Sequence, residues 1–218
     1  MHNTAYELGR LFFENFIGNK KCQVLELGSL NINGSLRDFA TPATEYMGVD
    51  LVPGKSVDRV ISDPYKLGFP EGSFDAVVSS SCFEHDKFFW LSFLEICRVI
   101  KENGVVYINA PSNGPYHTYP IDCWRFYPDA ALALAQWAGY NGVKMTLIES
   151  FIVQGKNVHW NDCVMIFKKG EHHDYAGPYL SNYYSTINNL RLNSSLNVLK
   201  IDCKSEDLTP TFDPDAKR

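Results

Sequence analysis

Short runs of hydrophobic residues alternate along the chain with stretches of helical periodicity. The apolar runs, each bounded by turn residues, predict seven strands. These span Cys22–Leu27, Thr44–Asp50, Asp58–Asp63, Phe74–Ser80, Val105–Ala110, Met145–Val153 and Cys163–Phe167. Helical spacing predicts three helices, over residues 4–18, 88–100 and 128–140. Strands that alternate with helices predict an α/β fold built on a doubly wound, mostly parallel sheet.

The last two predicted strands are connected differently from the others. The segment between Val153 and Cys163 is too short for a helical crossover, and parallel neighbours need one. We therefore expect a seven-stranded sheet whose last strand is antiparallel.

The composition changes after Lys169, where Asn, Tyr and Ser become frequent. We expect residues 1–169 to form one domain, with the N-terminal helix included, and residues 170–218 to form a polar, partly helical extension. Helical spacing inside it is kept by Leu180, Tyr183, Tyr184, Ile187 and Leu190. This segment is expected to dock on the domain or to join two copies as a homodimer, and residues beyond Asp202 are expected to be mobile.

Charge and cysteine content narrow the classes of partner. The 218 residues carry 20 Lys and Arg against 25 Asp and Glu, which argues against nucleic-acid binding. No apolar stretch reaches the roughly 18 residues of a membrane span. The six cysteines are scattered without any Cys-x-x-Cys pair, which predicts no metal site and no disulfide framework. This usage is typical of a reduced compartment, and we expect a cytoplasmic protein.

Candidate chemistry gathers where three predicted strands end. Gly28 follows the first strand and would let the backbone approach a ligand closely. Asp50 ends the second strand, where a carboxylate can accept hydrogen bonds from both hydroxyls of a ribose. Asp63 ends the third and could accept from an adenine amino group. Each residue also fits an ordinary turn, but together they predict a nucleoside site at one edge of the sheet.

The spacing disfavours a dinucleotide. Gly28 and Gly34 are six residues apart, whereas the dinucleotide fingerprint needs closer glycines that open directly into a helix. Glu26 would also oppose a pyrophosphate by its charge. These residues favour a nucleoside that carries a positively charged amino-acid end.

Residues from about 20 to 168 resemble class I S-adenosylmethionine-dependent methyltransferases, in the small-molecule branch with a Phe-Asp…Glu-His motif. The matching segments are VLELGS (24–29), MGVD (47–50), SDPYKLGFPEGSFDAVVSSSCFEH (62–85) and EICRVIKENGVVYINAP (95–111). Two further stretches, LGSLNINGSLR and HTYPIDCWRFYPDAAL, resemble bacterial methyltransferases that modify glycans or small molecules. Leu30 stands where the family usually has a second glycine, so the loop contacts differ from the family pattern.

The resemblance implies a Rossmann-like methyltransferase fold with S-adenosylmethionine as the cofactor. It implies cofactor-binding roles for Glu26, Gly28, Ser29, Asp50, Leu51, Asp63, Pro64, Ser79 and Ser80. Among these, Asp50 would hold the ribose hydroxyls and Leu51 would contact the adenine face, while Asp63 and Pro64 would border the adenine edge.

The acceptor is expected at the segment between the fifth strand and the next helix, residues 111–127. The family's motif for amine acceptors is absent, because residues 79–82 read Ser-Ser-Ser-Cys. His117 is our preferred general base, because a neutral imidazole accepts a proton near pH 7, and His85 is the second candidate. Asp122 would orient His117 or bind substrate. The expected substrate contacts are Tyr119, Trp124 and Arg125.

The leading hypothesis is a methyltransferase that acts on an oxygen of a small molecule or glycan precursor. One alternative is a catalytically inactive module of the same fold that binds the cofactor or a partner. A less favoured alternative is an NAD(P)-dependent oxidoreductase, which would need a phosphate-binding helix N-terminus after Gly28.

Overall fold

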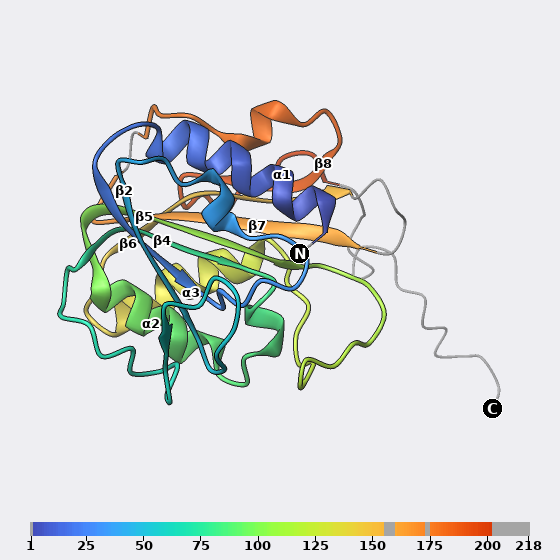
Figure 1. Cartoon of the computed structure of the whole chain (residues 1–218). Helices are drawn as coiled ribbons and strands as arrows, with labels where there is room; N and C mark the ends of the chain where they lie inside the picture. Colours follow the sequence, from blue (N-terminus) through green and yellow to red (C-terminus); the bar gives the residue numbers. More distant parts are fainter. Residues whose placement is uncertain (1, 155–159, 173–174, 202–218) are drawn as a thin grey trace.

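The computed structural model describes residues 2–154, 160–172 and 175–201. One sheet separates two helical layers (Figure 1). Helix α1 (Asn3–Phe12) covers one face, and α2 (Phe89–Val99) and α3 (Asp129–Tyr140) cover the other. Both α2 and α3 begin and end within one residue of the predicted helices.

The sheet has eight strands in the order β3-β2-β1-β4-β5-β7-β6-β8. They are β1 (Cys22–Leu27), β2 (Thr44–Asp50), β3 (Arg59–Val60), β4 (Phe74–Ser80), β5 (Ile100–Pro111), β6 (Met145–Gln154), β7 (Asn161–Lys169) and β8 (Ile187–Leu192). Strands β1 to β5 pair in parallel. Strand β7 is antiparallel to both β5 and β6. The predicted doubly wound, mostly parallel sheet is confirmed, and the last of the seven predicted strands, β7, is antiparallel. The predicted strand number is corrected to eight, because β8 adds to the edge beside β6.

The central strands are apolar on both faces and supply two hydrophobic cores. Successive side chains of a strand point to opposite faces, so Val77 enters the core beneath α2 and α3 while Val78 enters the core beneath α1. Val106 and Tyr107 of β5 divide in the same way. This burial on both sides explains why these strands appear in the sequence as continuous apolar runs.

Short helical turns complete the connections. A π-helical turn, η1 (Phe13–Ile17), continues α1. Only a 3-10 turn, η2 (Leu36–Phe39), lies between β1 and β2, and the Ser35 hydroxyl caps it by accepting from Arg37 N at 3.2 Å. A second 3-10 turn, η3 (Phe83–His85), follows β4, and a third, η4 (Leu180–Tyr183), precedes β8.

The third strand is shorter than predicted. Only Arg59 and Val60 pair with β2, instead of the expected span from Asp58 to Asp63. The chain then turns away before the Asp63-Pro64 dipeptide, because a proline cannot donate to a ladder and restricts the residue before it.

The helical spacing between Leu180 and Leu190 is followed only at its start, in the 3-10 turn η4, because residues 187–192 form β8 along the outer edge of β6. A bulge shifts the register between Ser150 and Ile152. The extra residue of a bulge changes the alternation of side chains, so Ile187 and Leu190 both enter the core beneath α1 although they are three positions apart.

The domain boundary expected at residue 169 stays a prediction, and the residues beyond Asp202 lie outside the described part of the chain. The five cysteines in the described ranges are free thiols. Within those same ranges, every helix is too short or too polar to cross a lipid bilayer.

Candidate cofactor and acceptor site

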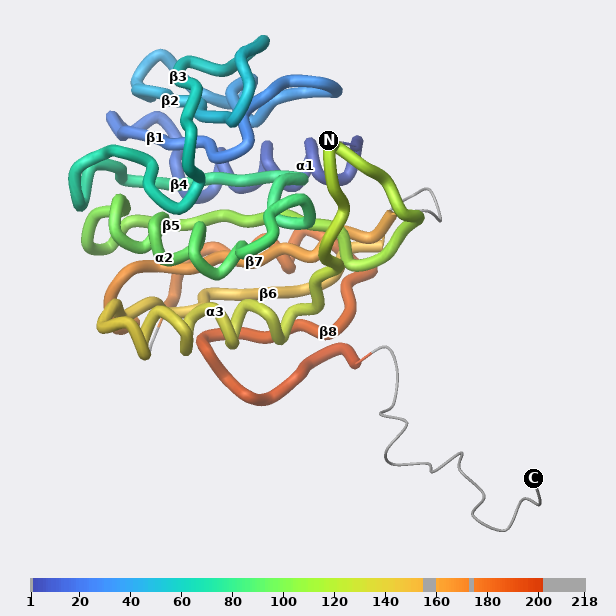
Figure 2. Tube along the Cα trace, turned by 90° about the horizontal axis from the view of Figure 1, so that it is seen from below, coloured from blue at the N-terminus to red at the C-terminus, as the bar shows by residue number. Residues whose placement is uncertain are grey.

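The strand order reverses between β1 and β4, so the connections that leave these two strands diverge. Ligands of open α/β sheets bind in the crevice that this divergence creates at the carboxyl ends of the strands. A cavity of about 1070 Å³ lies there, at the upper end of the usual size of small-molecule sites. Figure 2 shows the segment after β5 (yellow-green) beside the N-terminus, where both border this cavity.

Ten of the residues singled out in the sequence line the cavity. They are Glu26, Gly28, Ser29, Asp50, Leu51, Pro64, Ser80, His85, His117 and Tyr119. The carboxyl ends of β1, β2 and β4 supply the expected cofactor residues, and η3 with the segment after β5 supplies the histidines and Tyr119.

Gly28 ends β1 in a conformation that favours glycine. Its φ is +79°, and a Cβ there would lie 2.6 Å from the sulfur of Cys82. The N–H groups of Gly28 and Ser29 both donate to the carbonyl of Val49, at 3.0 and 3.1 Å. The chain therefore turns tightly against the end of β2 and leaves room above it.

The carboxylate of Asp50 is fixed by the loops on either side of it. Leu30 N donates to Oδ2 at 3.0 Å and Leu51 N donates to Oδ1 at 2.7 Å. An ionised carboxylate has about four acceptor positions, so Asp50 keeps capacity for hydroxyl donors on its cavity side.

Glu26 is 3% exposed and accepts a hydrogen bond from the Tyr46 hydroxyl at 2.8 Å. Burial raises the pKa of Glu26 to about 7. A cationic ligand group in the cavity would favour the charged form of this carboxyl, since opposite charges stabilise each other at low dielectric.

Two buried hydroxyls belong to residues that line the same cavity. Ser29 and Ser80 are 2% and 7% exposed, and their oxygens have no hydrogen-bond partner among the described residues. Because buried polar groups are normally paired, these hydroxyls fit a ligand with several polar groups. Together with Gly28 and Asp50, they match the chemistry of a nucleoside that carries an amino-acid end.

The η3 turn holds the segment after β5 in place. Cys123 N and Trp124 N donate to the carbonyl of Glu84 at 2.7 and 3.2 Å. His85 Nδ1 contacts the carbonyl oxygen of Ile121. Burial lowers the pKa of His85, so its imidazole is neutral near pH 7. The rings of His85 and His117 meet edge to face, with 4.9 Å between their centres.

Asp122 lies behind His117, outside the cavity lining. Both terminal nitrogens of Arg125 donate to its carboxylate, at 2.6 and 2.7 Å, and they hold the pKa of Asp122 well below its usual range. His117 N donates to Asp122 Oδ2 at 2.8 Å, and His117 Nδ1 lies 3.2 Å from the same oxygen. Asp122 can therefore orient His117 but does not reach the cavity.

Four other predicted site residues are also turned away from the cavity. Asp63 accepts from Tyr65 N at 2.8 Å, and the Ser79 hydroxyl donates to the carbonyl of Leu27 at 2.9 Å. Trp124 donates from Nε1 to the carbonyl of Asp86 at 2.8 Å. Arg125 is engaged by Asp122. In each case the polar side-chain group has a partner inside the protein, and none of the four residues lines the cavity.

Among the cavity residues that the sequence did not single out are His2 and Trp160. The Trp160 ring packs edge to face on His117, with 4.9 Å between ring centres. The sequence did contain one indication for Trp160. The last two strands were predicted to be antiparallel, so the loop that joins β6 to β7 must lie at the carboxyl edge of the sheet. His2 Nε2 lies 3.2 Å from Oδ2 of the buried Asp162, a contact that no local pattern indicates.

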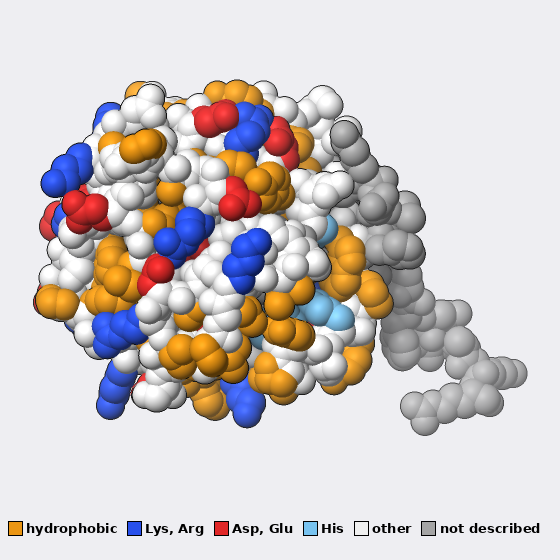
Figure 3. Space-filling view, in the orientation of Figure 1, with side chains coloured by type: hydrophobic (Ala, Val, Ile, Leu, Met, Phe, Trp, Pro, Cys, Tyr) orange, Lys and Arg blue, Asp and Glu red, His pale blue; other side chains and the backbone are white. Residues whose placement is uncertain are grey.

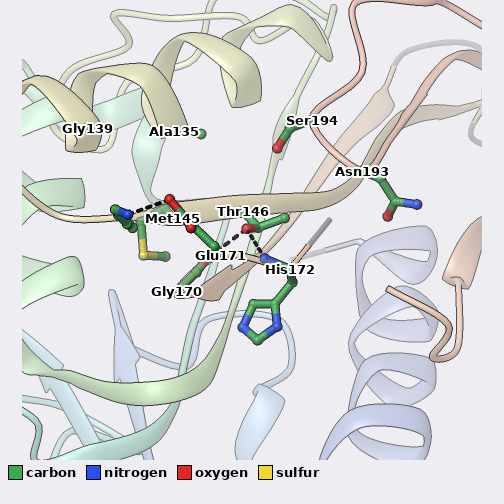
Figure 4. A pocket seen from close by; sticks show the side chains of 10 residues that line it. Ala135, Gly139, Met145, Thr146, Gly170, Glu171, His172, Asn193 and Ser194 are labelled. Carbon is green, nitrogen blue, oxygen red and sulfur yellow. Dashed lines mark hydrogen bonds and ion pairs between the residues drawn. The ribbon is translucent and has the colours of Figure 1, made fainter. Parts of the chain in front are cut away.

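The surface around this edge is mixed. Figure 3 shows histidine side chains among hydrophobic ones on the side of the molecule where the N-terminal end of α1 lies. A smaller hollow of about 260 Å³ lies at the opposite edge of the sheet, where β6 begins and β7 ends (Figure 4). Thr146 Oγ1 donates to the carbonyl of Gly170 at 2.7 Å there and accepts from His172 N at 3.0 Å. None of the predicted site residues lines this hollow.

Comparisons with known proteins give one matching family model and several solved structures of similar fold. Residues 25–108 match the family profile described as a methyltransferase domain. No curated protein matches the chain by sequence.

Among solved structures, 1,6-didemethyltoxoflavin-N1-methyltransferase of Burkholderia thailandensis is 17% identical, with a TM-score of 0.59 over 76% of this chain and 78% of that one. The [4+2]-cyclase SpnF is 13% identical, with a TM-score of 0.55 over 75% and 80%. The YcgJ protein of Bacillus subtilis is 13% identical, with a TM-score of 0.55 over 78% and 100%. At these identities the likeness concerns the fold.

The fold thus places one large cavity at the carboxyl ends of the strands, where ligands of open α/β sheets bind. Residues 25–108 match the methyltransferase-domain family model, and the chain has the fold of class I S-adenosylmethionine-dependent methyltransferases.

Proposed function

We propose that this enzyme transfers the methyl group of S-adenosylmethionine to an oxygen of a small molecule or glycan precursor. The observation that carries the proposal is the continuity of one cavity, which runs from Gly28 and Asp50 to the wall formed by His117, Tyr119 and Trp160. A cofactor held at the first two residues would present its reactive end toward that wall.

The proposed cofactor contacts follow the strand ends. Asp50 would accept from the ribose hydroxyls and Leu51 would contact the adenine. Glu26 and the hydroxyls of Ser29 and Ser80 would take the polar methionine end. Asp63 and Ser79 would act only through the backbone, because their side chains bond elsewhere.

The cofactor supplies a methyl group already activated by its positive sulfur, so the protein mainly has to align the acceptor and exclude water. A hydroxyl acceptor also needs to lose a proton. With its Nδ1 directed at Asp122, His117 would accept that proton at Nε2, and His85 is the second candidate. Asp122 would act as a positioning residue.

Oxygen is favoured over amine nitrogen because residues 79–82 lack the amine-acceptor motif. Tyr119 and Trp160 suit the flat or ring-shaped faces of organic acceptors and sugars. The acidic balance of the chain supports a small-molecule acceptor rather than a nucleic acid. A cytoplasmic location and a homodimer formed through the C-terminal segment remain part of this proposal.

The first test is cofactor binding by calorimetry, with S-adenosylmethionine and S-adenosylhomocysteine as ligands and NAD as the control. Asp50→Asn should weaken binding by about 10- to 150-fold, because hydrogen bonds to a charged group contribute about 1.5–3 kcal/mol. Asp63→Asn is the matched variant, since an amide oxygen can still accept from Tyr65 N, and it should change binding by less than about threefold. Equal losses in the two variants would refute the placement of the ribose at Asp50.

The second test is a screen of hydroxylated acceptors with labelled cofactor, followed by identification of the methylated atom. Transfer to oxygen, with a His117→Gln variant that loses kcat and regains part of it at high pH, is the expected result. Transfer to nitrogen, or His117→Gln with an unchanged pH profile, would contradict the proposed acceptor or base.

A further inference from the structure

Three side chains at the histidine end of the cavity form a compact group of metal-binding type. Glu84, His85 and His117 each offer one ligand atom, and these atoms all lie within 4.8 Å of one another. His85 Nε2 lies 3.7 Å from Glu84 Oε1. All three residues line the cavity, although Glu84 and His117 are far apart in the sequence.

Each imidazole has a partner behind it that leaves one nitrogen free. His85 Nδ1 is directed at the carbonyl of Ile121, so Nδ1 carries the proton and the lone pair is on Nε2. His117 Nδ1 lies 3.2 Å from Asp122 Oδ2. The two atoms do not meet as a hydrogen bond, but the charge of the carboxylate favours a proton on Nδ1 over Nε2. Metal-binding histidines are typically held in this way by a carbonyl or carboxylate on the second ring nitrogen.

Glu84 adds a buried carboxyl group with an unused oxygen. Its side chain is 2% exposed, and Oε2 has no hydrogen-bond partner among the described residues. An ionised carboxylate at such a position is costly at low dielectric unless it has a partner. A bound cation would remove that cost.

We propose that Glu84, His85 and His117 bind a divalent first-row transition metal ion, of which Zn²⁺ is the best candidate. Two imidazoles and one carboxylate are the ligands that zinc takes in catalytic sites with an open fourth position. Here the open position faces the cavity, where an oxygen atom of a bound molecule would complete the coordination.

The site is independent of the acceptor, so it can be tested without one. In the metal-bound protein, His117 Nε2 is a ligand and no longer a free base. The metal ion would then lower the pKa of a hydroxyl group bound to it. The role of His117 as a general base would apply only to the metal-free protein.

The test is titration of the full chain, purified without a histidine tag, with Zn²⁺ by calorimetry and with Co²⁺ by visible absorption. We expect one ion per chain and a tetrahedral-type Co²⁺ spectrum. Glu84→Gln and His117→Asn should each weaken Zn²⁺ binding by at least about 100-fold, because even an outer partner of a ligand is worth about 10- to 100-fold. Asp122→Asn should weaken it by about tenfold.

His172→Ala is the matched control, since His172 lies at the opposite edge of the sheet and its loss should leave Zn²⁺ binding unchanged. Circular dichroism of each variant without metal verifies that it is folded. Glu84→Gln and His117→Asn test the proposed metal site independently of each other. Unchanged Zn²⁺ affinity in the folded ligand variants, or no bound ion in the wild type, would overturn the proposal. Either result leaves cofactor binding at Asp50 untouched, so failure of the metal site and failure of the methyltransferase proposal are distinguishable.

Discussion

At the end of β1, one glycine is required for two separate reasons. Gly28 has a positive φ, and it also lies against Cys82 so closely that any Cβ would collide with it. Gly142, after α3, has the same φ of +79° but has no atom within 4 Å of the Cβ position. A comparison of Gly28 with Gly142 therefore separates the cost of a positive φ from the cost of a steric clash with Cys82.

We expect Gly142→Ala to lower the free energy of unfolding by about 1 kcal/mol, the cost of the left-handed region for a residue with a side chain. Gly28→Ala should cost a further 1–3 kcal/mol or so, because the neighbouring backbone has to move away from the new methyl group. Urea denaturation of both variants measures the difference. Equal losses of unfolding free energy in the two variants would mean that the loop beside Cys82 moves away from the new methyl group at no cost.

The residues that reach the cavity show which positions can be predicted from sequence. Glu26, Gly28 and Asp50 occupy strand ends, and the alternation and order of strands place them without knowledge of the loops. Trp124 and Arg125 lie in a loop whose path depends on hydrogen bonds to Glu84 and Asp122. Such long-range contacts have no local signature, and the same reason hid the cluster of Glu84, His85 and His117.

At the scale of elements, the segment that follows β7 is part of the main fold. Strand β8 pairs with β6, and η4 is held because Leu180 N and Ser181 N donate to the buried carboxylate of Glu149 at 2.5 and 3.1 Å. The sequence predicted docking of this segment from its apolar spacing. The strand could not be predicted, because the bulge opposite Ile152 places two inward-facing residues of β8 three positions apart, which is a helical spacing.

Two leucine substitutions test how much this segment stabilises the protein. Leu180 is fully buried, whereas Leu196 is 78% exposed. Leu180→Ala should reduce the free energy of unfolding by about 2–5 kcal/mol, and Leu196→Ala should change it by less than about 0.5 kcal/mol. Thermal denaturation checks both, and a small effect of Leu180→Ala would show that the segment only rests on the surface.

At the scale of the whole molecule, buried carboxyl groups dominate the electrostatics. Burial raises the pKa of Glu26, Glu149 and Asp162 to about 7 and that of Glu84 to about 8. In the unfolded chain these groups ionise near their ordinary values of 4.5 and 3.8. The native state therefore binds more protons than the unfolded state up to about pH 8.

It follows that the free energy of unfolding falls as the pH rises from 6.5 to 8, because the unfolded state binds fewer protons in this window. The lowered pKa values of His2 and His85 act in the opposite direction, but this effect fades within about one pH unit above their ordinary value of 6.5. We expect a decrease of roughly 2–4 kcal/mol over the window, measured by urea denaturation without ligands.

Glu149→Gln should make this pH dependence shallower, because it removes one of the four groups and leaves the amide oxygen to accept from the η4 backbone. Glu71→Gln, at an exposed position, is the control and should leave the slope as it is. A wild type whose stability rises between pH 6.5 and 8 would contradict the assignment of these carboxyls as protonated in the native state.

Both lateral edges of the sheet are closed to further growth. At one side, β3 presents only two residues, too few to template a new strand. At the other, the chain folds back beyond β8, where Leu190 N donates to the carbonyl of Leu199 at 2.8 Å and Leu199 N donates in return at 2.7 Å. Long unpaired edges are the usual starting points of edge-to-edge aggregation. A second copy of the chain must therefore associate through side chains, and concentrated solutions should be resistant to the fibrous, cross-β type of self-assembly.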